Sequence, residues 1–154
     1  MMVVVQPSAW AFPAEVVGIT DGDTLTVLSQ QRKQTRCRLA GIDAPEKRQA
    51  FGSVSKQSLS DLAFRKVVEV NVIDRDRYGR SVCLIKREGV DLNLEQVRRG
   101  MAWVYLRYNR DRLYRLAEEE ARKERRGLWS EPVPVPPWEF RKRVSQTQLD
   151  AAMN

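Results

Sequence analysis

Histidine is absent from this sequence of 154 residues, and cysteine occurs only twice, at Cys37 and Cys83. The absence of histidine excludes histidine-dependent catalytic triads, histidine general bases and histidine metal sites. Two cysteines are too few for a structural zinc site made of cysteine alone. Any metal must therefore be held by oxygen ligands, which suit hard cations such as calcium or magnesium. Acid–base chemistry must come from Asp, Glu, Lys, Arg or Tyr.

Long apolar runs are also missing. No segment reaches the roughly 20 consecutive apolar residues that a membrane-spanning helix needs. Residues 1–13, MMVVVQPSAWAFP, are mildly apolar and contain an Ala-Trp-Ala pattern typical of the end of a secretory signal, but they lack a basic start. We interpret them as either a leader remnant or a flexible arm. A leader would make the protein secreted or periplasmic, and the alternative location is cytoplasmic.

The charge of the chain is strongly positive. Lys and Arg together number 27 against 20 for Asp and Glu, which gives a net charge of +7 and a pI near 9.8. A net positive charge of this size on a small domain favours polyanionic partners, such as nucleic acid or an anionic membrane surface. A soluble protein with a basic surface is the alternative that charge alone leaves open.

The periodicity of apolar residues predicts short strands followed by helices. The predicted strands are residues 15–19, 23–28, 35–42, 67–73 and 81–86, and the predicted helices are residues 53–65, 91–99 and 111–126. This order indicates an α+β domain over residues 14–129, a five-stranded OB-fold barrel with about three α-helices. Residues 130–154 form a proline-rich extension, which we expect to lie extended over the surface and to end in a frayed tail.

Charged residues gather at three ends of the predicted strands, in the segments DGDT, RLAGIDAPE and DRYGR. If these ends converge, Asp23 and Asp43 can bind one cation between them. The guanidinium groups of Arg38 and Arg80 suit a phosphate, and Glu46 can orient or deprotonate a water. Each motif alone is more often an ordinary turn or loop. The hypothesis therefore depends on the three motifs occurring together.

Five segments in order, VVGITDGDTLTV, CRLAGIDAPE, QAFG, DRYGR and VRRGMAWVY, resemble the thermonuclease family of staphylococcal-nuclease-like domains. The resemblance covers about residues 14–129. It implies an OB-type barrel with three helices. It also implies a calcium-dependent endonuclease, with one ion per site, that cuts both DNA and RNA and leaves 3′-phosphate ends. We expect the protein to act as a monomer.

The resemblance also assigns roles to individual residues. It implies that Asp23, Asp43 and the backbone carbonyl of Ala44 bind calcium, with Asp21 behind the metal. It implies that Arg38 and Arg80 bind the phosphate, that Glu46 acts as general base or positions the water, and that Tyr78 and Tyr108 touch the nucleotide. The segment after Glu46 is short, so a lysine-rich loop of the best-known pattern is missing and substrate preference can differ.

Two alternatives stay open at the level of sequence. The main rival function is a catalytically weak or inactive OB-fold module that binds single-stranded nucleic acid, while a peptide-binding scaffold would need an aromatic cage that the sequence does not indicate. Cys37 and Cys83 fall on inward faces of neighbouring predicted strands. They either form a disulfide, which would suit a secreted protein, or remain two buried thiols.

Overall fold

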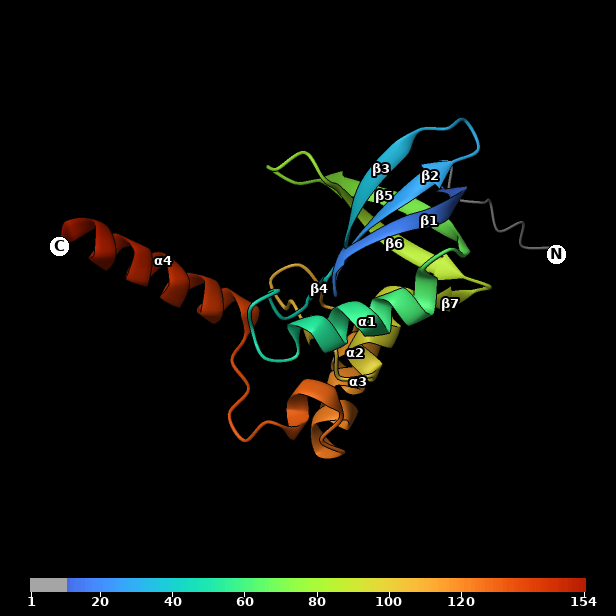
Figure 1. Ribbon diagram of the computed structural model, residues 1–154. Coiled ribbons are helices and arrows are strands. Elements are labelled where there is room, and N and C mark those ends of the chain that lie inside the picture. Colours follow the sequence, from blue (N-terminus) through green and yellow to red (C-terminus); the bar gives the residue numbers. More distant parts are fainter. Residues whose placement is uncertain (1–10) are drawn as a thin grey trace.

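A computed structural model describes residues 11–154 of the chain, so most of the predicted leader or arm, residues 1–10, lies outside the described part. Five strands form a barrel at one end of the molecule (Figure 1). They are β1 (Ala11–Asp21), β2 (Thr24–Ser29), β3 (Gln34–Leu39), β5 (Val67–Arg75) and β6 (Ser81–Arg87). Their order is β3-β2-β1-β5-β6, and a parallel pairing of β3 with β6 closes the sheet on itself. The expected OB-fold barrel is confirmed.

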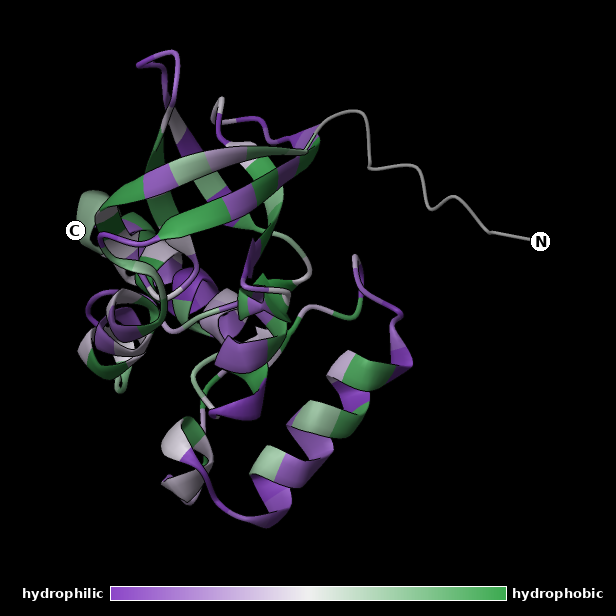
Figure 2. Cartoon of the chain, turned by 90° about the vertical axis from the view of Figure 1, so that its right-hand side faces the viewer, coloured by the Kyte–Doolittle hydropathy of each residue, from purple (hydrophilic) through white to green (hydrophobic). Residues whose placement is uncertain are grey.

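The alternation of side chains along the strands forms the barrel core. On β3 the side chains of Cys37 and Leu39 are completely buried, whereas Arg36 and Arg38 point to the other face. Figure 2 shows the same alternation of hydrophilic and hydrophobic residues along the barrel strands. Because this period of two fixes the register, Arg38 has to leave the core where β3 ends.

The two cysteines lie side by side inside the barrel. Leu39 pairs with Cys83 across the parallel β3–β6 ladder, and both Cys37 and Cys83 are buried free thiols. The Cys37 thiol and burial together raise the pKa of Cys83 well above its ordinary value. Of the two alternatives for these cysteines, the structure has the pair of buried thiols, which pack as small apolar side chains.

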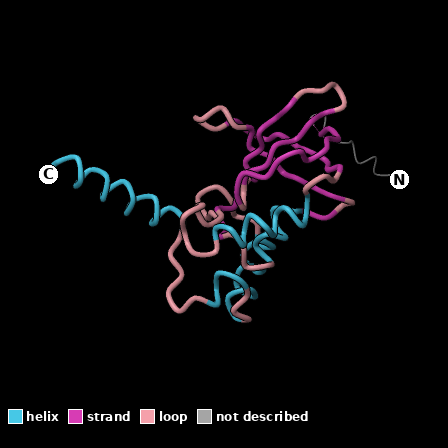
Figure 3. Tube along the Cα trace, viewed as in Figure 1, coloured by secondary structure: helices cyan, strands magenta, loops and turns pink. Residues whose placement is uncertain are grey.

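Three helices form a separate layer that lies against one end of the barrel (Figure 3). They are α1 (Gly52–Ala63), α2 (Leu92–Arg98) and α3 (Arg112–Lys123). Two short strands, β4 (Ile42–Asp43) and β8 (Trp103–Val104), pair with each other, and β7 (Val90–Asp91) extends the edge of β6. A short 3-10 helix, η1 (Gly127–Ser130), follows α3.

Helical spacing within residues 111–126 predicts an apolar stripe of Leu113, Leu116, Ala117 and Ala121, and the buried face of α3 differs from it. Leu113 and Leu116, expected in that stripe, are exposed, while Ala117 and Ala121 are buried as expected. Tyr114 is buried in place of the leucines, and its hydroxyl donates a 2.7 Å hydrogen bond to Oδ2 of Asp91. The polar tip of Tyr114 has a partner inside the fold, so the helix can turn this larger ring inward.

The two ends of the predicted domain also need correction. Residues 11–13, assigned to a leader or arm, belong to β1 and pair with β5, with Phe12 opposite Val70. Residues 137–153, expected to be extended and frayed, form a fourth α-helix, α4 (Pro137–Met153), which projects away from the body (Figure 1). Pro137 opens this helix because proline is well suited to the first helical turn. Among the described residues no helix is long and apolar enough to cross a membrane.

Candidate active site

The turn between β1 and β2 presents two aspartates at the end of the barrel. The backbone N–H of Asp23 donates a 3.0 Å hydrogen bond to Oδ1 of Asp21, and the hydroxyl of Thr24 donates to Oδ1 of Asp23 at 3.1 Å. The turn is held from below by Gln96 of α2, whose Nε2 donates to the carbonyl of Gly22 at 2.7 Å. Gly22 lies directly against Ser55 of α1, leaving no room for a Cβ atom. The positions of both aspartates therefore depend on the helix layer.

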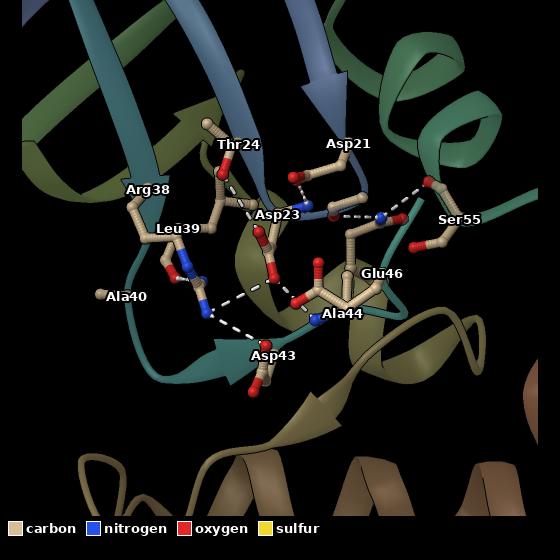
Figure 4. Close-up of polar contacts among 12 residues, drawn as sticks. Asp21, Asp23, Thr24, Arg38, Leu39, Ala40, Asp43, Ala44, Glu46 and Ser55 are labelled. Carbon is tan, nitrogen blue, oxygen red and sulfur yellow. Dashed lines mark hydrogen bonds and ion pairs between the residues drawn. The ribbon is translucent and has the colours of Figure 1, made fainter. Parts of the chain in front are cut away.

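The end of β3 and the short strand β4 bring the second acidic group to the same place. Oδ2 of Asp23 accepts a 2.7 Å hydrogen bond from the backbone N–H of Ala44. Nη2 of Arg38 lies 3.4 Å from both Oδ2 of Asp23 and Oδ1 of Asp43. Figure 4 shows Asp23, Arg38 and Asp43 facing one another. Arg38 is held by a further hydrogen bond from Nη1 to the carbonyl of Leu39 at 2.8 Å.

The acidic residues of this cluster are largely buried, which changes their protonation. Burial, together with the neighbouring charge of Asp23, raises the pKa of Asp21 to about 7. Burial also raises the pKa of Asp43, against the opposing effect of nearby arginines. A buried carboxylate carries a free-energy cost when it is ionised, and a nearby cation offsets that cost by stabilising the anion. The electrostatics of the cluster therefore favour binding of positive charge.

The β5–β6 loop supplies the second predicted phosphate ligand. Nε of Arg80 donates a 2.7 Å hydrogen bond to Oδ2 of Asp76, and the N–H groups of Tyr78 and Arg80 both donate to Oδ1. Although partial burial raises the pKa of Asp76, the hydrogen bonds from Arg80 and Tyr78 lower it overall. The Arg80 guanidinium also lies 5.6 Å from the centre of the Tyr78 ring. Asp76 therefore positions Arg80.

The three predicted strand ends converge on one cleft. Eight of the nine predicted site residues line it, together with residues that were not predicted. We call it the acidic cleft, and its lining is Asp21, Asp23, Arg38, Asp43, Ala44, Pro45, Glu46, Arg77, Tyr78, Arg80, Tyr105, Trp138, Arg141, Lys142, Ser145, Gln146 and Leu149. The ninth predicted site residue, Tyr108, does not line the acidic cleft. Tyr108 instead packs edge-to-face on Tyr105, with ring centres 5.0 Å apart, and Tyr105 lines the cleft in its place.

Comparison with known proteins identifies the family of the chain. The family model described as "Staphylococcal nuclease homologue" matches residues 36–131. The chain belongs to the staphylococcal nuclease family. Similar proteins include a "Micrococcal nuclease" of Shigella flexneri, 42% identical over 92% of this chain and 88% of that protein. An "Uncharacterized endonuclease" of Haemophilus influenzae is 44% identical over 83% of this chain and 72% of its own length.

Nuclease-family membership makes nucleic acid the substrate class, and the acidic cleft contains donors of the kind that a hard cation needs. Carboxylate oxygens of Asp23 and Asp43 face each other across Nη2 of Arg38, and Asp21 lies behind Asp23. These are oxygen ligands in a partly buried setting, which fits calcium or a similar ion. Within residues 11–154, however, no three Asp, Glu or Cys side chains already form a cage around a metal. Calcium binding thus stays a prediction for this nuclease-family chain.

Several residues of the cleft escaped sequence reasoning. Gln96 and Ser55 support the Asp21–Asp23 turn from the helix layer. The only signal in the sequence was the polar Gln96 among the apolar residues of the predicted helix 91–99. Arg141 comes from α4, in the segment that the sequence analysis predicts to be extended and frayed. Its Nη1 donates to Oε1 of Glu46 at 2.6 Å and its Nη2 to Oδ2 of Asp43 at 2.7 Å. No local pattern announces this contact, because it joins residues 98 positions apart.

Proposed function

We propose that the protein is a calcium-dependent endonuclease that hydrolyses phosphodiester bonds of both DNA and RNA and leaves 3′-phosphate ends. The single observation that carries this proposal is the convergence of two arginines and a cluster of carboxylates from three separate strand ends on one cleft. Membership of the nuclease family supports the reaction class. The net charge of +7 supports binding of a polyanion.

The reaction divides among the residues of the cleft as follows. Glu46 takes a proton from a water, whose oxygen attacks phosphorus as the bond from phosphorus to the 5′-oxygen breaks. The 5′-oxygen leaves and takes up a proton, so one strand ends in a 3′-phosphate and the other in a 5′-hydroxyl. Arg38 and Arg80 bind the non-bridging oxygens and stabilise the negative charge that grows on them in the transition state.

A divalent cation would be held by Asp23 and Asp43, with the carbonyl of Ala44 as a further ligand and Asp21 as support. When bound there, such an ion would supply Lewis-acid stabilisation of the charge that develops on the phosphoryl oxygens. The N–H of Ala44 fixes the orientation of Asp23, and Pro45 stiffens the chain between Asp43 and Glu46 by fixing its own φ. Tyr78, at the rim of the cleft, is placed to contact a nucleotide base or sugar. Tyr108 could do so only after moving from its packing on Tyr105.

Plasmid DNA and single-stranded RNA, each incubated with the protein and calcium or a chelator, test this function. We expect calcium-dependent cutting of both. Primer extension from the cut DNA should need prior treatment with a phosphatase, because a 3′-phosphate blocks a polymerase. The Glu46→Gln variant, which keeps the shape of the side chain, should cut about 100-fold to 10,000-fold more slowly.

The rival, an inactive module that binds single-stranded nucleic acid, gives the opposite result. It would retain RNA in a gel-shift assay without cutting it under any divalent ion. Equal cutting by the wild type and Glu46→Gln would also overturn the assignment of Glu46. Products that extend without a phosphatase would overturn the proposed direction of cleavage.

A further inference from the structure

Helix α4 closes the acidic cleft with a cation of its own. The helix projects away from the barrel (Figure 1), yet its first turns line the cleft through Trp138, Arg141 and Lys142. The Arg141 guanidinium donates to both oxygens of Asp43, at 3.2 and 2.7 Å, and to Oε1 of Glu46 at 2.6 Å. Arg141 is thus the one residue of α4 that forms ion pairs with the barrel side of the cleft among the described residues.

The position of Arg141 is set by packing and not by a flexible side chain alone. Trp138, three residues earlier and on the same face of the helix, stacks on Tyr105 with ring centres 5.6 Å apart and packs edge-to-face on Trp103 at 5.5 Å. Just before the helix, the carbonyl of Val135 accepts a hydrogen bond from the side chain of Gln49. These contacts anchor the start of α4 beside the Glu46 loop and point Arg141 at the cleft.

The oxygens that Arg141 occupies are the ones that the proposed reaction needs. Asp43 is a proposed calcium ligand, and here both of its oxygens accept hydrogen bonds from the Arg141 guanidinium. Glu46 is the proposed base, and its Oε1, which accepts a hydrogen bond from Arg141, is not free to accept a proton from water. Arg141 lies closer to the two oxygens of Asp43, at 3.2 and 2.7 Å, than Arg38 does to one of them, at 3.4 Å. A divalent cation that binds Asp43 is therefore repelled by the Arg141 guanidinium and has to displace it. Hydrogen bonds to Asp43 and Glu46 raise the pKa of Arg141, so this cation cannot leave by losing its proton.

We propose that Arg141 is an internal counter-cation that competes with the divalent cation for Asp43 and Glu46, so that α4 is an autoinhibitory latch on the cleft. This inference rests on the proposed function, because it takes Asp43 as a metal ligand. Calcium displaces the guanidinium, which swings out on its long side chain and frees Glu46. The exposed half of the Arg141 side chain gives it a path to solvent.

Calorimetric titration of the full chain with calcium chloride, in the absence of nucleic acid, tests the latch. The key variant is Arg141→Gln, which removes the charge and keeps a long polar side chain. The matched control is Arg143→Gln, which makes the same charge change two residues along the same exposed helix and does not line the cleft. We expect Arg141→Gln to bind calcium about tenfold or more tightly than the wild type, going by the strength of charge-assisted hydrogen bonds. Arg143→Gln should stay within about twofold, since its charge is screened.

A further variant, Arg141→Lys, keeps the charge but loses the two-pronged geometry, so its calcium affinity should lie between those of the wild type and Arg141→Gln. Equal calcium affinity of Arg141→Gln and the wild type would overturn the latch. If the wild type still cuts nucleic acid with calcium, the proposed function survives that result. A raised KM for nucleic acid with unchanged calcium affinity would make Arg141 a substrate-binding residue and would also overturn the latch. If neither the wild type nor any of these variants binds calcium or cuts nucleic acid with calcium, the proposed function is overturned together with the latch.

Discussion

The two walls of the acidic cleft are built in different ways. On the barrel wall, Asp23 and Asp43 are buried, and hydrogen bonds from Thr24, Ala44 and Arg38 fix their oxygens. On the opposite wall, α4 is exposed along most of its length and is attached chiefly through Trp138 and Arg141. A carboxylate pair held by several elements is pre-organised for binding, whereas a helix held at one end can move without unfolding the domain.

The difference suggests a division of labour between the walls. The barrel wall carries the groups that must keep a fixed geometry during reaction, since small displacements of such groups are costly in rate. The α4 wall carries groups whose displacement opens the cleft. Substitutions on the barrel wall should therefore reduce activity, and substitutions on the α4 wall should mainly change how readily the cleft opens.

The largest effect is expected for the two arginines of the barrel wall. Arg38→Ala and Arg80→Ala should each lower kcat/KM about 100-fold to 1,000-fold, because each removes a donor that stabilises charge in the transition state. Steady-state cutting of a defined oligonucleotide measures this loss. The controls are Arg36→Ala, on the same strand as Arg38, and Arg75→Ala, on the strand before Arg80, since both lie outside the cleft. Losses in the controls as large as those in the test variants would show that the arginines act only through overall charge.

A smaller effect is expected where the helix layer supports the barrel wall. Gly22→Ala places a methyl group where Ser55 and Ala44 already lie, so it should lower the free energy of unfolding by about 1–3 kcal/mol and displace Asp21 and Asp23. Chemical denaturation measures the first change, and kcat/KM should fall with it. The matched control is Gly18→Ala, where an added Cβ would come no closer than 3.7 Å to Thr26. An equal loss in both variants would indicate a general cost of replacing glycine in this part of the chain.

The barrel wall was largely predictable from the sequence. The period of two along β3 places Arg38 outside the core, and turn residues place Asp21, Asp23 and Asp43 at strand ends. OB topology then brings these ends together, which is why separate weak motifs combine into one site. Local pattern and global fold agree here, so little beyond the sequence was needed.

The α4 wall and the helix supports were not predictable in the same way. The many prolines between residues 130 and 140 indicate an extended chain. Pro137 nevertheless begins a helix, because proline fits the first turn and no proline follows it in α4. The contacts of Arg141 with Asp43, and of Gln96 with Gly22, join distant segments and depend on packing angles that no local pattern encodes. Tyr108 illustrates the same limit, since its position in a loop depends on packing against Tyr105.

The comparison of the two walls is sharpest for a pair of tryptophans that belong to one aromatic cluster. Trp129 is buried against Trp103, with ring centres 4.4 Å apart, and lies on the body of the domain. Trp138 also packs edge-to-face on Trp103, with ring centres 5.5 Å apart, but belongs to α4. Trp129→Ala should cost about 3–5 kcal/mol of unfolding free energy, as expected for a large buried side chain.

Trp138→Ala should cost less than about 1 kcal/mol of global stability, because it releases α4 while the barrel and its three helices stay folded. Hydrogen exchange measures both levels at once: amides of residues 141–153 should lose protection, while amides of β2, β3 and β6 keep theirs. Release of α4 also withdraws Arg141 from Asp43, so this variant should bind calcium more tightly, in the same direction as Arg141→Gln. If barrel amides lose protection together with α4, the helix is part of the cooperative fold, and the two walls of the cleft form one structural unit.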